Sequence, residues 1–195
     1  MQNLINYLKL IPRLFYFLFN FFCYNKLNLR AIVFLSVRVQ GKKYISIGRN
    51  SVIQRGGWLL AIKIDNTDPI LEIGDNCAIG DYCHITAVRK VKFENDVLLA
   101  NNVYISDNLH DYENINIPII NQPVKFKKEV IIGAGSWIGE NVCIIGASVG
   151  RNSIIGSNSV VTNDIEDFCV AVGSPARIIK RFDLNTKKWI SVKDN

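Results

Sequence analysis

The sequence has few of the residues from which metal sites are built. Its 195 residues include two histidines and five cysteines, and no two cysteines form a C-x-x-C pair. The spacing of a zinc site is therefore absent. Acidic residues are also missing from residues 1–64, which contain ten Lys and Arg, and all 17 acids follow Lys63. A basic front and a mildly acidic remainder argue against a nucleic-acid-binding surface, so we expect neither a metal nor a nucleic-acid partner.

Long apolar runs are missing as well. The longest, from Leu14 to Tyr24, falls well short of the roughly 20 residues of a membrane-spanning helix. Two interpretations stay open: a helix packed on its own or a neighbouring subunit, and an interfacial anchor in the lipid headgroup region. We expect a cytoplasmic protein, with residues 1–30 as the segment that would contact the inner face of the cytoplasmic membrane.

β-branched residues are abundant. The sequence contains 28 Ile and 17 Val against 15 Leu and 9 Ala, which predicts a core of strands rather than a helical bundle. Asn occurs 21 times, and Asn tolerates the left-handed backbone conformation of tight corners.

An aliphatic residue recurs at every sixth position over much of the chain. A period of six fits neither an α-helix nor simple alternating strands, and indicates a coil of short strands and corners whose stacked aliphatics form internal ladders. Gly often follows the aliphatic residue, as in Ile73-Gly74 and Ile138-Gly139. The repeated positions are Ile47, Ile53, Leu59, Ile73, Ile79, Ile85, Val91, Val97, Val103, Ile132, Ile138, Ile144, Val149, Ile155 and Val161.

This [Ile/Val]-Gly-x-x-x-x array resembles the hexapeptide-repeat acyltransferases. The resemblance implies a mainly β fold, a left-handed parallel β-helix of triangular section, and a homotrimer with active sites between subunits. We expect an N-terminal apolar and basic segment over 1–44, mostly helical, and the β-helix over 45–165 with an extended loop at 106–129. A closing segment and tail with a short helix is expected over 166–195.

The extended loop contains His110, which an acyl transfer could use as a general base for the acceptor hydroxyl. The segment from Val103 to His110 looks like the stretch of the galactoside and maltose acetyltransferases that ends in their catalytic histidine. With Gln122-Pro123 downstream, it is most similar to the capsular and lipopolysaccharide O-acetyltransferases. We expect His110 to be catalytic and Asp107 to orient its ring. His84, the other histidine, is expected to lie on the surface.

The C-terminal half also resembles the family, and the resemblance implies acetyl-CoA as co-substrate. Trp137, before Ile-Gly, would line the acetyl and pantetheine cleft, and matching positions in the last coil and closing segment would bind the rest of the coenzyme. Forked cationic groups suit its phosphates. The positions that match are Ser157, Thr162, Arg177 and Lys180.

Several positions depart from the family pattern. Asn163 stands where relatives usually have Lys, and Gly80 and Val88 replace residues that contact the acceptor in the galactoside enzymes. The expected activity is therefore acetyl-CoA-dependent O-acetylation of a sugar hydroxyl in a capsule, lipopolysaccharide or related glycan, and a simple galactoside is not favoured. Two alternatives stay open: N-acetylation of an amino nucleotide sugar, and an inactive structural β-helix. A β-helical carbonic anhydrase needs three histidines, and the chain has two.

Overall fold

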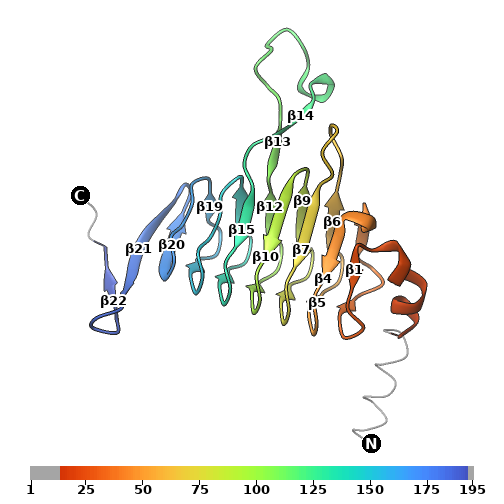
Figure 1. The fold of residues 1–195 in the computed structure, drawn as a ribbon. Helices are drawn as coiled ribbons and strands as arrows, with labels where there is room; N and C mark the ends of the chain where they lie inside the picture. The colour runs from red at the N-terminus through yellow and green to blue at the C-terminus, as the bar shows by residue number, and fades with distance from the viewer. Residues whose placement is uncertain (1–13, 193–195) are drawn as a thin grey trace, which may run out of the picture.

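The computed structural model describes residues 14–192, and most of them form a coil of short parallel strands (Figure 1). Each turn of the coil visits three sheets in the order A, B, C. Sheet A consists of β1 (Lys26–Leu27), β4 (Ile45–Ile47), β7 (Ile70–Ile73), β10 (Lys90–Phe93) and β15 (Val130–Ile132). Sheet C consists of β3 (Arg38–Gln40), β6 (Trp58–Ala61), β9 (His84–Ala87), β12 (Tyr104–Ser106), β17 (Cys143–Ile145) and β19 (Val160–Val161). The predicted mainly β fold with parallel sheets is confirmed.

Sheet B lies between the other two along each turn and extends furthest toward the C-terminus. Its parallel strands are β2 (Ile32–Val33), β5 (Val52–Ile53), β8 (Ala78–Ile79), β11 (Leu98–Leu99), β16 (Trp137–Ile138), β18 (Ile154–Ile155) and β20 (Cys169–Gly173). Two antiparallel strands, β21 (Ala176–Asp183) and β22 (Lys188–Ser191), continue the sheet. The short C-terminal helix that we expected is wrong: β21 pairs with the exposed edge of β20, and its half-buried Ile178 packs against the core.

The first turn of the coil begins at Lys26, inside the segment that we expected to precede the β-helix. Leu27, Val33 and Val39 are in register with Ile47, Ile53 and Leu59 of the next turn. Within the described residues only 14–20 are α-helical, followed by a 3-10 turn η1 (Phe21–Cys23). No helix in this part of the chain is long and apolar enough to cross a membrane.

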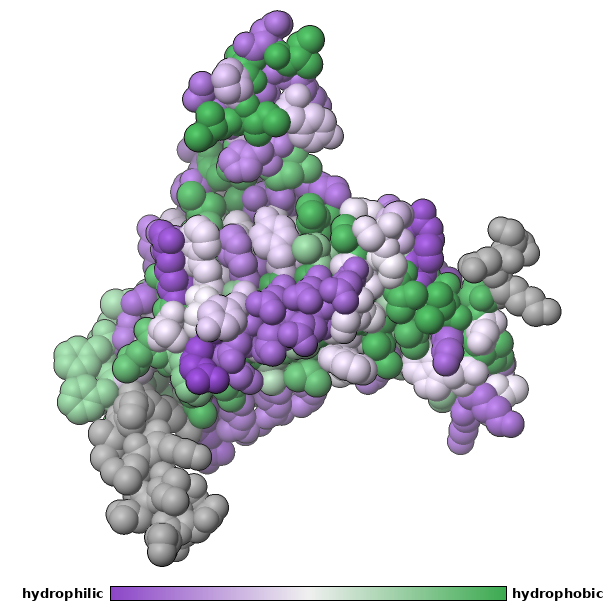
Figure 2. Space-filling view, turned by 180° about the vertical axis from the view of Figure 1, so that it is seen from behind, coloured by the Kyte–Doolittle hydropathy of each residue, from purple (hydrophilic) through white to green (hydrophobic). Residues whose placement is uncertain are grey.

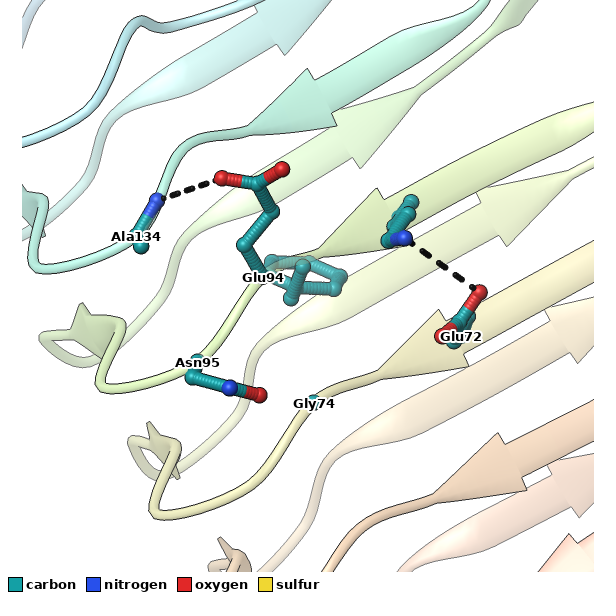
Figure 3. A pocket seen from close by; sticks show the side chains of 7 residues that line it. Glu72, Gly74, Glu94, Asn95 and Ala134 are labelled. Atoms are coloured by element: carbon teal, nitrogen blue, oxygen red, sulfur yellow. Dashed lines mark hydrogen bonds and ion pairs between the residues drawn. The ribbon is translucent and has the colours of Figure 1, made fainter.

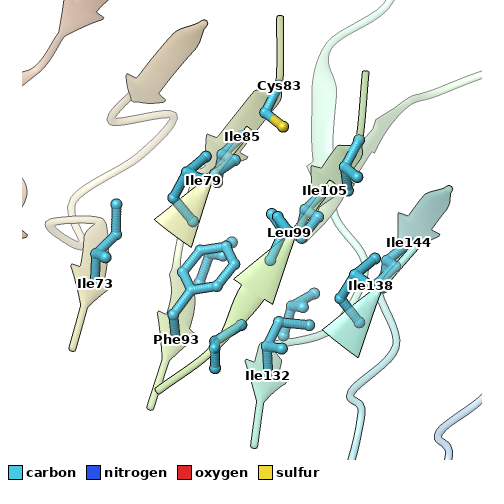
Figure 4. Packing of buried hydrophobic residues seen from close by; sticks show 14 of the residues in the cluster. Ile73, Ile79, Cys83, Ile85, Phe93, Leu99, Ile105, Ile132, Ile138 and Ile144 are labelled. Atoms are coloured by element: carbon cyan, nitrogen blue, oxygen red, sulfur yellow. The ribbon is translucent and has the colours of Figure 1, made fainter. Parts of the chain in front are cut away.

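Three ladders of buried aliphatic side chains fill the coil (Figure 4). One ladder runs through Ile79, Leu99 and Ile138, which are directly paired between adjacent strands of sheet B. In two of the three sides of each turn, successive ladder residues are six apart, as in Ile73 to Ile79 and Ile79 to Ile85. The period of six is thus the spacing from one sheet to the next.

The repeat shifts by two residues after Ile85. We expected Val91, Val97 and Val103 to continue the ladders, but Phe93, Leu99 and Ile105 pair with Ile73, Ile79 and Ile85. The reason is an extra pair of residues, Val88 and Arg89, at the corner from sheet C to sheet A. The three valines are also buried, which is why the sequence pattern did not expose the shift.

Every change in turn length occurs at this corner between sheets C and A. The chain inserts a 3-10 turn η2 (Lys42–Tyr44), a loop over 62–69, the pair 88–89 and a long arm over 107–129 there. The other two corners stay constant, since each coil must place its aliphatic residue on the ladder below. Insertions of successive turns therefore lie next to one another along one edge of the coil.

The constant corners are held by polar side chains that bond from turn to turn. Six of the ten non-glycine residues with positive φ are Asn, as the composition predicted. The Asn76 amide accepts from Asn50 at 3.1 Å and donates to Asp96 at 3.0 Å. At the same corner Glu94 accepts the backbone N–H of Ala134 at 3.0 Å (Figure 3). The hollow of about 250 Å³ in Figure 3 is thus lined by groups that join the coils.

The ladder predicts that truncating either of two adjacent residues of β7 has a very different effect on the free energy of unfolding. Leu71 is fully buried, whereas Ile70 is 48% exposed on the outer face. We expect Leu71→Ala to lower the free energy of unfolding by about 2–5 kcal/mol, because it leaves a cavity in a packed core. The matched change Ile70→Ala should cost less than about 1 kcal/mol. Denaturant unfolding of both variants measures the difference, and equal losses would contradict the ladder.

Candidate active site

The arm over 107–129 carries the predicted catalytic histidine. It projects from the edge of the coil as a two-stranded antiparallel ribbon, β13 (Asn108–His110) and β14 (Val124–Phe126), with a 3-10 turn η3 (Ile119–Asn121) in its outer part (Figures 1 and 2). His110 pairs with Val124, and its side chain is exposed. It makes no hydrogen bond or ion pair within residues 14–192. The imidazole is therefore accessible from solvent.

Asp107 fastens the base of the arm. Its carboxylate is completely buried and accepts the backbone N–H groups of Val88 at 2.9 Å, Arg89 at 2.7 Å and Lys90 at 2.8 Å. Its backbone carbonyl accepts the N–H of Lys127 at 2.8 Å. One residue thus joins the corner of the preceding turn to the two ends of the arm.

These contacts differ from the role that we expected for Asp107. Its carboxylate bonds to the corner, not to the ring of His110, and its remaining side-chain partner is the Asn108 amide at 2.8 Å. The other neighbouring carboxyl, Asp111, pairs with Lys125 at 2.8 Å, and that contact holds the pKa of Asp111 below its usual range. Asp107 is linked to His110 through the backbone, because β13, which contains His110, starts directly after Asp107.

Two further residues organise the arm through contacts that the sequence pattern did not indicate. Gln122 is buried in the outer part of the arm, where its amide donates to the carbonyls of Asn114 at 2.9 Å and Ile117 at 2.8 Å. Arg89 forms an ion pair with Asp65, and its guanidinium lies 5.7 Å from the ring centroid of Phe126. Arg89 therefore links the 62–69 loop to the arm. The buried valines hid the two-residue insertion that contains Arg89, so the sequence pattern offered no signal for this contact.

The predicted coenzyme-binding residues are exposed and lie mainly on or beside sheet B. Trp137 is in β16 with 48% of its surface exposed, and Arg177 and Lys180 are in β21. Neither cation forms an ion pair in the described part of the chain. Ser157 lies at the corner after β18, whereas Thr162 follows β19 at the end of sheet C. Four of the five thus share one region.

A single chain does not bring this region and His110 together. The arm leaves the coil at the corner between sheets C and A, and in a coil of three sheets that corner is opposite sheet B. His110 and Trp137 therefore belong to different sides of the molecule. A site that uses both needs residues from two copies.

His84 lies on the outer face of sheet C within a row of aromatic rings. Its ring stacks on Trp58 at 4.4 Å between centroids and meets the edge of Tyr104 at 5.3 Å. Thr86 is within 3.0 Å of Nε2. Burial lowers the pKa of His84.

In residues 14–192 no group of three His, Cys, Asp or Glu could hold a metal ion.

The buried carboxylate of Asp107 generates a prediction about stability. Asp107→Ala leaves several backbone N–H groups at the corner without a partner, and each buried unpaired donor costs about 1–3 kcal/mol. We expect thermal unfolding to shift down markedly in Asp107→Ala. In the matched variant Asp111→Ala, which loses an ion pair at the surface, the cost should be below about 1 kcal/mol. A normal melting temperature for Asp107→Ala would contradict this anchoring role.

Comparisons with known proteins show which family profile and which proteins this chain is similar to. The profile described as the hexapeptide repeat of succinyl-transferase matches residues 70–107 and 129–163. A probable acetyltransferase of Mycobacterium tuberculosis is 34% identical over 116 residues, which are 59% of this chain and 38% of that protein. Escherichia coli WbbJ, assigned as a lipopolysaccharide biosynthesis O-acetyl transferase, is 43% identical over 61 residues, 31% of each chain. The chain thus spans about a third of the length of these relatives.

Solved structures share the fold. AntD from Bacillus cereus, an N-acyltransferase crystallised with dTDP and 3-hydroxybutyryl-CoA, superposes with a TM-score of 0.70 at 19% identity, over 84% of this chain and 86% of that one. The polysialic-acid-specific acetyltransferase NeuO superposes with a TM-score of 0.56 at 27% identity, over 77% and 66%. This chain thus contains the six-residue repeat of that profile and shares its coil of short parallel strands with solved acyltransferases.

Proposed function

We propose that the protein is an acetyl-CoA-dependent O-acetyltransferase that modifies a sugar hydroxyl of a surface polysaccharide. One observation carries the proposal: His110 is exposed and unpaired on an arm whose base is fastened by a buried carboxylate. The partial similarity to WbbJ and the shared fold of NeuO favour a glycan acceptor. Left-handed winding of the coil is part of the same proposal.

His110 would act as the general base. A neutral imidazole accepts the proton of the acceptor hydroxyl as its oxygen attacks the acyl carbon, and the proton then passes to the leaving thiolate. Acetyl-CoA supplies an acyl group that is already activated as a thioester. The antiparallel pairing of His110 with Val124 holds the backbone of the base in a ribbon, and Asp107 fixes where that ribbon begins.

The chain's exposed groups fit the chemistry of the coenzyme. Arg177 and Lys180 are cations without a carboxylate partner in the described residues, so they are available to phosphate oxygens. Trp137 offers a half-exposed indole to the pantetheine arm. Ser157 and Thr162 add hydroxyls at the ends of neighbouring strands. Trp137, Ser157, Arg177 and Lys180 would hold the coenzyme beside sheet B, and Thr162 would contact it from the end of sheet C.

The arm with His110 and the coenzyme-binding residues beside sheet B lie on different sides of one chain. The proposed site therefore requires an assembly of copies of the chain. The outer face of sheet B carries a stripe of apolar side chains in register, and Leu98, next to Trp137, is 47% exposed. We propose that copies of the chain pack through this face as a homotrimer. The arm of one copy would then bring His110 to the coenzyme-binding residues of its neighbour.

An amine acceptor is the second candidate. AntD, which shares the fold, is an N-acyltransferase, and the same arm and base would serve transfer to the amino group of a nucleotide sugar. Incubation with acetyl-CoA and panels of glycans and amino nucleotide sugars, read by mass, separates the two. If only the amino nucleotide sugars gain the mass of an acetyl group, N-acetylation replaces O-acetylation as the assigned activity.

The histidines provide a matched pair of variants. We expect His110→Ala to lower kcat by at least about 10²-fold, the scale of a general base, while folding and coenzyme binding are retained. The other histidine serves as the control, because His84→Gln removes an imidazole within the aromatic row. Its turnover should stay within a few-fold of the parent protein. Release of free thiol measures both, and near-normal activity of His110→Ala would overturn the assignment.

Two exposed residues of equal accessibility test the assembly. We expect Leu98→Arg to give a monomer with little activity, since it places a charge on the apolar face of sheet B. Ile70, on the outer face of sheet A, is 48% exposed, and Ile70→Arg should remain trimeric and active. Light scattering coupled to size exclusion gives the mass of each variant. Trimers in both cases would show that sheet B is not the interface.

A further inference from the structure

The helix over residues 14–20 is apolar on two sides, and the body covers one of them. Tyr16 and Phe17 are half-buried and pack against the core of the coil, and the Tyr16 hydroxyl lies 2.6 Å from that of buried Tyr24. Asn20 accepts a hydrogen bond from Lys42 Nζ at 2.7 Å. These contacts fix the orientation of the helix on the first turn of the coil.

The opposite side of the helix, continued by η1, carries large apolar side chains that no other described residue covers. Phe15, Leu18, Phe19 and Phe22 follow the spacing of one helical face, and their exposed fractions are 60%, 60%, 75% and 92%. The rings of Phe15 and Phe19 stack at 5.6 Å between centroids. Figure 2 shows apolar side chains gathered at this end of the molecule, beside the grey atoms. Such a contiguous patch marks a surface that binds something.

The residues around this patch are mostly cationic; residues 1–64 contain no Asp or Glu, and Asp68 of the 62–69 loop lies near Lys43. Lys26, Arg30, Lys42 and Lys43 lie in or beside the first turn of the coil, and none of them forms an ion pair within residues 14–192. By contrast Arg49, Arg55 and Lys63, in the next turn, each pair with an aspartate. The first turn of the coil, on which the helix packs, thus carries four cations that form no ion pair within residues 14–192.

We propose that this end of the protein docks on the surface of a lipid bilayer that contains acidic phospholipids. The exposed aromatic and aliphatic side chains would enter the headgroup region, where an aromatic-rich helix face is stable. The lysines and arginines around them would meet the lipid phosphates. The helix over residues 14–20 would lie along the surface, with one face on the coil and its exposed face on the lipid.

The charges favour a bilayer over a second copy of the chain. Copies that docked through the same end would bring their unpaired cations face to face, and residues 1–64 contain no carboxylate to separate them. An acidic bilayer offers both an apolar layer and anions at its surface. The docking would place the first turn of the coil at the membrane and leave the arm, three turns further along, free for a glycan acceptor.

Co-sedimentation of the full chain with vesicles tests this proposal. We expect binding to vesicles of phosphatidylcholine with about one third phosphatidylglycerol, weaker binding at high salt, and little binding to pure phosphatidylcholine. The triple variant Phe15→Ser, Phe19→Ser, Phe22→Ser should lose at least about 10-fold in partitioning, because each ring contributes apolar burial. Its side chains are exposed, so circular dichroism and thermal unfolding should match the parent protein.

Matched control variants distinguish binding through the patch from non-specific binding through other exposed apolar or charged side chains. Ile115→Ser, Ile120→Ser and Leu184→Ser together remove three side chains that are 93%, 87% and 67% exposed elsewhere on the molecule, and this variant should bind like the parent. Lys26→Gln with Arg30→Gln should weaken binding, whereas Lys187→Gln with Lys188→Gln should not. His110→Ala should bind normally, which keeps the result independent of catalysis.

Three outcomes would overturn the proposal. One is equal binding to acidic and neutral vesicles, and another is normal binding by the triple phenylalanine variant. The third is absence of vesicle binding together with a smaller particle in light scattering for that variant. This last result would show that the aromatic side chains join copies of the chain.

Discussion

The structure depends on one constraint: each turn of the coil must place its aliphatic side chains on the ladders of the turn before it while its strands bond in parallel register. Two of the three sides obey this with six residues, as between Ile73, Ile79 and Ile85. Any residue added there would move a side chain off its ladder and break the bonds on both sides. Variation is therefore confined to the corner between sheets C and A, where the chain can leave the coil without disturbing it.

The candidate site is built on the insertion at this corner. The arm carries His110 away from the coil, and the buried carboxylate of Asp107 ties its base to the extra residues of the preceding turn. Sheet B is opposite this corner, so Trp137, Arg177 and Lys180 lie away from the base of the arm. In the proposed function, the site is therefore divided between copies of the chain that pack through the apolar outer face of sheet B.

The first turn of the coil combines two roles in a short segment. One face of the helix over residues 14–20 covers the end of the core, and the other presents phenylalanines among unpaired cations. A helix that is apolar all round is normally buried. Half of this helix is exposed instead, and the proposed docking on an acidic bilayer would cover that half.

The sequence alone determined the coil, because the period of six, the Ile and Val content and the Asn corners are local properties. It also pointed to His110 as the candidate base, because this residue lies where the period breaks. Tertiary structure decided what local pattern could not. The shift from Val91 to Phe93 was hidden because both residues are buried, and the strand at 176–183 depends on the free edge of β20. Only the stacking of turns showed that Asp107 bonds to Val88, Arg89 and Lys90, since these residues are distant in sequence and meet only through parallel pairing.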